Sequence, residues 1–77
     1  MDREKFGQLL NLASRHLAEA REAISHQRKL LTDMVKQGED TAEVRALLEQ
    51  LESSAEAMAE HERSIQEQLW AFEHDGD

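Results

Sequence analysis

The chain has 77 residues, no cysteine, no proline and no tyrosine, and it carries a formal net charge of −8. This length suits a single domain, and the absence of cysteine excludes disulfides, thiolate metal sites and thiol catalysis. The acidic balance disfavours nucleic acid binding, which needs a basic surface to neutralise phosphates. No apolar run approaches membrane-spanning length, and the N-terminus lacks the apolar core of a signal peptide. We therefore expect a soluble, cytoplasmic protein that binds no cofactor, nucleic acid or membrane.

The first element is predicted to be a helix over about residues 2–37. Its apolar residues recur at alternating spacings of four and three, which is the heptad pattern of a helix that packs against another helix. Gln27 is the one polar interruption of this seam. The predicted core residues of this arm are Phe6, Leu10, Leu17, Ile24, Leu31 and Met34.

The chain then bends at residues 38–40. Lys36 in the last helical turn followed by Gly38 is a helix stop, since glycine adopts the left-handed conformation without strain. Asp40 is expected to cap the next helix, with Glu43 bonding back to the cap as in a capping box. A stop followed directly by a start predicts a turn between two helices.

The second helix is predicted over about residues 41–73, followed by a frayed tail at 74–77. Its predicted core residues are Val44, Leu48, Leu51, Met58, Ile65, Leu69 and Phe72. Glu62 occupies a seam position where an apolar residue is expected. The heptad phase slips by three residues across the bend, which a continuous helix would have to absorb as a stammer. A bend explains the slip better.

The fold class is therefore all-α, with two long helices forming an antiparallel hairpin. Folding at the bend pairs residues whose numbers sum to roughly 78, such as Phe6 with Phe72. Residues 1–38 carry seven basic and five acidic residues, whereas the remainder carries two and twelve. This difference in charge favours pairing of the first arm with the second.

The two edges of the hairpin differ in polarity. One edge, at the g positions with Leu12 beside them, mixes apolar and neutral polar side chains, and the other is largely charged. We expect a second hairpin to pack on the first edge, giving a homodimeric four-helix bundle. This predicted interface, called the leucine edge below, comprises Leu9, Leu12, His16, Ala23, Leu30, Leu47, Ser54 and His61.

Two features invite a more specific interpretation. His16 lies opposite His61 in the predicted register, with Glu62 adjacent, so these three residues are the candidates for a metal- or pH-responsive site. The alternative is a hydrated polar layer at the edge of the bundle, because no Glu-x-x-His, HxxxH or HExxH pattern occurs. Trp70 is expected to close the open end of the hairpin beside Leu69 and Phe72, the alternative being a binding hot spot for a partner.

Several segments are similar to short bacterial helical-hairpin proteins. The similarity covers Gly38-Glu39-Asp40-Thr41-Ala42, Ala46-Leu47-Leu48, Leu51-Glu52, His16-Leu17-Ala18-Glu19-Ala20, Gln27, His61, Arg63 and Ile65. The resemblance implies a coiled-coil hairpin in a bacterial cytoplasm, and it implies no activity.

We expect a protein–protein interaction or structural module that acts as a homodimer, and no catalytic residues. Serine, histidine and acidic residues lie on regular helices without loops to organise a triad, and no Gly-rich phosphate loop is present. One alternative is a regulatory adaptor that binds helices of a different protein. Another is a metal- or pH-responsive bundle that uses His16 and His61.

Overall fold

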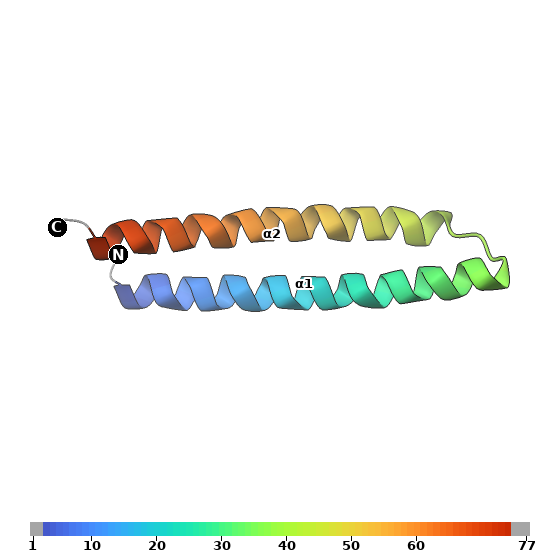
Figure 1. Ribbon diagram of the computed structural model, residues 1–77, viewed down its shortest axis with the longest axis horizontal. Coiled ribbons are helices and arrows are strands. Elements are labelled where there is room, and N and C mark those ends of the chain that lie inside the picture. The colour runs from blue at the N-terminus through green and yellow to red at the C-terminus, as the bar shows by residue number, and fades with distance from the viewer. Residues whose placement is uncertain (1–2, 75–77) are drawn as a thin grey trace.

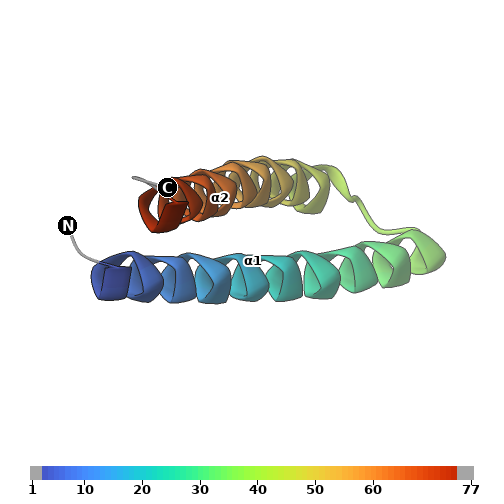
Figure 2. The same cartoon turned by 60° about the vertical axis from the view of Figure 1, so that its left-hand side comes forward.

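The computed structural model describes residues 3–74, which form two long α-helices, α1 (Arg3–Gln37) and α2 (Ala42–His74). The helices lie side by side and antiparallel, so that α1 begins and α2 ends at the same end of a hairpin 61 Å long (Figures 1 and 2). We call this the open end. The predicted all-α hairpin is confirmed. Neither described helix is both long enough and apolar enough to cross a membrane.

The bend is a Schellman motif followed by a helix cap. Gly38 adopts φ = 72°, its amide donates to the carbonyl of Val35 at 3.1 Å, and the Glu39 amide donates to the carbonyl of Met34 at 3.0 Å. These bonds satisfy carbonyl groups that the last turn of α1 would leave unpaired.

The start of α2 differs from the predicted capping box. The first helical bond runs from the Arg45 amide to the carbonyl of Thr41 at 2.9 Å, so Thr41 rather than Asp40 is the N-cap residue. The Asp40 carboxylate instead accepts from the Ala42 amide at 3.1 Å. This is an Asx-turn, in which the side chain bonds the backbone two residues ahead. The predicted start at Asp2 and the predicted tail at 75–77 lie outside the described residues, and His74 ends α2.

The core is a single seam between the two helices. The five side chains that are buried in the described part of the chain all lie at heptad seam positions; they are Ala13, Leu17, Ile24, Leu48 and Ile65. Most other seam residues are half-buried, Gln27 and Glu62 among them. Phe72 differs from the prediction because its side chain is 46% exposed. A two-helix seam shields each residue from one direction only, so half-burial is the usual state.

Two kinds of contact fix the register along the seam. The rings of Phe6 and Phe72 meet with centroids 5.8 Å apart at the open end. Ion pairs join Arg3 to Glu73 at 3.2 Å, and Arg28 to Glu52 at 2.7 Å, along one edge. The residue numbers of all three pairs sum to within two of 78, the register that the heptads predict.

Candidate interaction surface

The leucine edge carries four of the seven large hydrophobic residues that are exposed within residues 3–74. Leu9, Leu12, Leu30 and Leu47 are between 41% and 47% exposed. His16, Ser54 and His61 are also exposed, and Ala23 is half-buried. Residues three, four or seven apart share one face of a helix, so the heptad phase places α1 and α2 members along one side of the hairpin. The predicted interface residues therefore lie along one side of the hairpin.

Helix α2 contributes to this edge a stripe that contains no Asp, Glu, Lys or Arg. We call it the neutral stripe; its members are Leu47, Gln50, Ser54, Ala57, His61, Ser64, Gln68 and Ala71. This is notable in a helix that carries eight glutamates and only two arginines. The predicted interface named only three of these residues. Following the i, i+3, i+4, i+7 pattern along α2 alone identifies the remainder.

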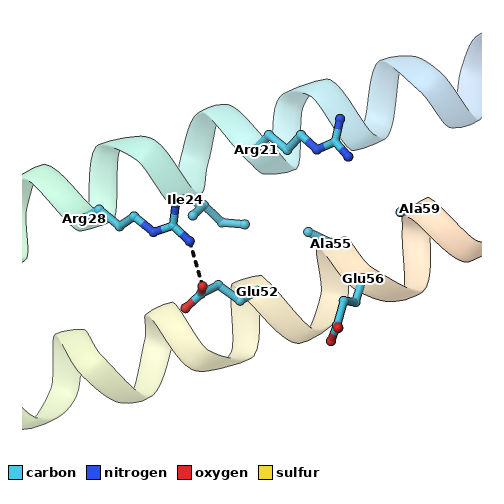
Figure 3. Close-up of a pocket in the computed structure, with 7 residues that line it drawn as sticks. All are labelled: Arg21, Ile24, Arg28, Glu52, Ala55, Glu56 and Ala59. Atoms are coloured by element: carbon cyan, nitrogen blue, oxygen red, sulfur yellow. Dashed lines mark hydrogen bonds and ion pairs between the residues drawn. The ribbon is translucent and has the colours of Figure 1, made fainter.

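The opposite edge, which we call the charged edge, carries a hollow. Its volume is about 640 Å³, and it is lined by Arg21, Ile24, Arg28, Glu52, Ala55, Glu56 and Ala59. Figure 3 shows arginines from α1 on one rim, glutamates from α2 on the other, and the Arg28–Glu52 ion pair across the hollow. Ala55 and Ala59 leave the space open because their side chains end at Cβ. Sequence reasoning missed this hollow.

The candidate metal ligands differ in their exposure. His16 and His61 are both exposed, and Glu62 is half-buried in the seam beside them. Within residues 3–74, no group of three or more His, Cys, Asp or Glu side chains is placed to hold a metal ion.

Trp70 does not close the open end of the hairpin, so the predicted role as an aromatic plug is wrong. Its side chain is 63% exposed, and its ring stacks on that of His74 with centroids 4.1 Å apart and planes 19° from parallel. The His74 Nδ1 atom lies 2.7 Å from the carbonyl oxygen of Trp70, which holds the imidazole in place. Neighbouring helical residues point about 100° apart, so Trp70 cannot share the seam face of Leu69.

Comparison of the chain with protein-family models, with curated proteins and with solved structures gave no match. The family and the bacterial setting that the sequence resemblance implies are therefore not established. Function must be argued from the surface of the hairpin itself.

Proposed function

We propose that this chain is a non-catalytic interaction or structural module that acts as a homodimer. In this proposal the leucine edges of two hairpins face each other and form an antiparallel four-helix bundle. The observation that carries it is a set of four leucines, each 41% to 47% exposed, on one side of the hairpin, with Leu9 and Leu12 near the open end and Leu30 and Leu47 near the bend. Single exposed leucines are ordinary on a protein surface, but all four exposed leucines of residues 3–74 gather on one side of the hairpin, which supports an interface there.

The solvent-exposed area of the chain supports a second copy as the partner. The chain exposes 6020 Å², whereas a compact monomer of 8.8 kDa is expected to expose about 4,800 Å². The difference of about 1,200 Å² exceeds the roughly 800 Å² that each partner contributes to a standard interface. Covering the leucine edge with a second copy would therefore reduce the exposed surface of each chain to about that of a compact protein of its mass.

The small core also favours a homodimer. Within residues 3–74 only five side chains are buried, and none of them is below 2% exposure. Chains of this size without disulfides or metals commonly depend on oligomerisation for stability. A second copy would bury the half-buried d-position side chains of the seam, such as Leu51 and Met58, from a second direction.

Light scattering after size-exclusion chromatography tests the proposal at micromolar concentration. The wild-type chain is expected to have twice the mass of the monomer. Leu30→Glu places a charge in the leucine edge and is expected to abolish the dimer. Val35→Glu is the matched control, because Val35 is 54% exposed on the same helix but lies on the charged edge.

Circular dichroism on the same samples separates loss of the dimer from unrelated damage. Val35→Glu should retain the dimer and its helical signal, whereas Leu30→Glu should lose the dimer with or without its helicity. A wild-type monomer that gains helix only when a different helical protein is added would instead support the adaptor alternative. Melting that depends on zinc or on mild acidification would support the alternative based on His16 and His61.

A further inference from the structure

We infer that the two hairpins pack with their bends at opposite ends of the bundle, so that α1 lies against the partner's α1 and α2 against the partner's α2. The inference rests on the proposed homodimer. Two symmetric arrangements bring the leucine edges together, and neighbouring helices are antiparallel in both. In the other arrangement the bends share one end and α1 lies against the partner's α2. Side-chain size and local charge distinguish the two.

The position of the two-fold axis follows from the helix bounds. Residue 20 is the middle of α1 and residue 58 the middle of α2. These two positions are level with each other, because their numbers sum to the 78 of the hairpin register. A single two-fold axis at this level therefore lets both helices of one hairpin face helices of the partner along their full length.

Packing on α1 favours opposite ends. In that arrangement, facing positions on α1 have numbers that sum to about 39, so His16 faces the partner's Ala23. Leu9 faces the partner's Leu30, which brings leucines of the two copies together near each end. A large side chain against a small one fills the space between helices without a void.

The same alternation occurs on α2. Facing positions there sum to about 115, so Ser54 faces the partner's His61. With the bends at the same end, His16 would instead face the partner's His61 and Ala23 would face the partner's Ser54. The four imidazoles of the two hairpins would then crowd one layer, and the four small side chains would leave the next one poorly filled.

Charge permits the contact between two copies of α2. The helix has eight glutamates and two arginines, so two copies would repel if their acidic faces met. The neutral stripe is the part of α2 on the leucine edge, and the glutamates between residues 47 and 71 point to its other faces. Charges separated by more than about 8 Å of salt solution are largely screened.

Two of the charged residues that flank the leucine edge of α1 also favour opposite ends. Lys5 and Asp33 lie at equivalent heptad positions near the two ends of α1. With bends at opposite ends, Lys5 approaches the partner's Asp33. With bends at the same end, Asp33 approaches the partner's Glu43, and two pairs of like charges result.

A distance measurement between spin labels tests this arrangement in the full-length chain. The protein has no cysteine, so Glu39→Cys provides a unique labelling site in the bend. The separation between the two labels in the dimer is expected to be about 50 Å, since 35 residues of helix at 1.5 Å each separate the two bends. Glu60→Cys, near the middle of α2, is the matched control. It should give a separation below about 20 Å, because neighbouring helix axes lie 8–10 Å apart.

The experiment distinguishes failure of the proposed arrangement from failure of the proposed homodimer. A dimer whose Glu39→Cys labels lie within about 25 Å of each other has its bends at the same end, and it overturns this inference while leaving the homodimer intact. A labelled chain that is monomeric by light scattering overturns the homodimer and this inference with it.

Discussion

Phe6 and Phe72 face each other across the open end of the hairpin, with ring centroids 5.8 Å apart and planes inclined by 46°. The two residues are separated by almost the whole chain, so this tilted pair anchors the first turn of α1 to the last turns of α2. The Arg3–Glu73 ion pair lies beside it at 3.2 Å. Solvent screens that pair, because the Arg3 side chain is 71% exposed, and the rings therefore carry most of the contact.

A double-mutant cycle on Phe6 and Phe72 should detect this contact. Each alanine variant is expected to destabilise the hairpin, and the coupling between them should be about 0.5–1.5 kcal/mol, as for other aromatic pairs. Chemical denaturation followed by circular dichroism provides the measurement. The matched control is the cycle of Phe6 with Trp70, which should show no coupling because the Trp70 ring stacks on His74. Equal coupling in both cycles would show that the helix end frays as a unit.

The two described glycines should respond in opposite directions to alanine. Gly38 has φ = 72°, where an added Cβ is strained, so Gly38→Ala should destabilise the hairpin by about 1 kcal/mol. Gly7 lies within α1, so Gly7→Ala should stabilise it by about 0.5–1 kcal/mol. An added Cβ meets no atom within 4 Å at either site, so backbone conformation alone determines the sign. Thermal melting of the two variants checks the prediction, and a shift in the same direction for both would contradict it.

A variant at Gly38 can test whether the bend or the packing of the seam determines the hairpin topology. Replacing Gly38 and Glu39 together with alanine removes the helix stop and favours one continuous helix, which would convert the hairpin into an extended dimer. Small-angle scattering would detect the longer particle. An unchanged hairpin would show that packing along the seam dictates the topology.

Glu62 should be replaceable by leucine with a gain in stability. The side chain is half-buried in the seam, level with the buried Leu17, and it makes no ion pair or hydrogen bond within residues 3–74. Removing a partly desolvated carboxylate and adding apolar contact should stabilise the hairpin by about 1 kcal/mol. Glu60→Leu is the control, since Glu60 is exposed on the same helix and should change the stability little. A destabilised Glu62→Leu variant would reveal a partner for the carboxylate in the assembled dimer.

Heptad spacing predicted the hairpin because it reports a physical requirement that is repeated at every turn. The apolar residues of α1 and α2 fall on one face each, and only the register that sums to 78 lets both faces meet along their full length. The Schellman bend was predictable for a similar reason, since Gly38 is the only glycine near the bend and glycine adopts a positive φ without strain.

The features that sequence reasoning missed have different causes. Trp70 was assigned to the open end from its neighbours in the chain, but the 100° rotation per residue turns it to the outer face. Phe72 is more exposed than predicted because no further layer follows it at the helix end. The choice of Thr41 over Asp40 as the N-cap depends on which residue leaves helical geometry, and both types are good caps.

Glu19 provides the sharpest test of how two hairpins meet. It lies on α1 one residue from the middle of the helix, and it is exposed beside the leucine edge. With bends at opposite ends, Glu19 approaches the partner's Glu19 across the two-fold axis, which is the one like-charge contact that this arrangement creates on α1.

Glu19→Gln should therefore tighten the dimer, with a several-fold lower dissociation constant at low salt and a smaller gain at high salt. With bends at the same end, Glu19 would instead approach the partner's Ala57, and the substitution should leave the dissociation constant unchanged. Glu22→Gln removes an equal charge from the outer face of the same helix and serves as the control, measured in parallel by sedimentation equilibrium.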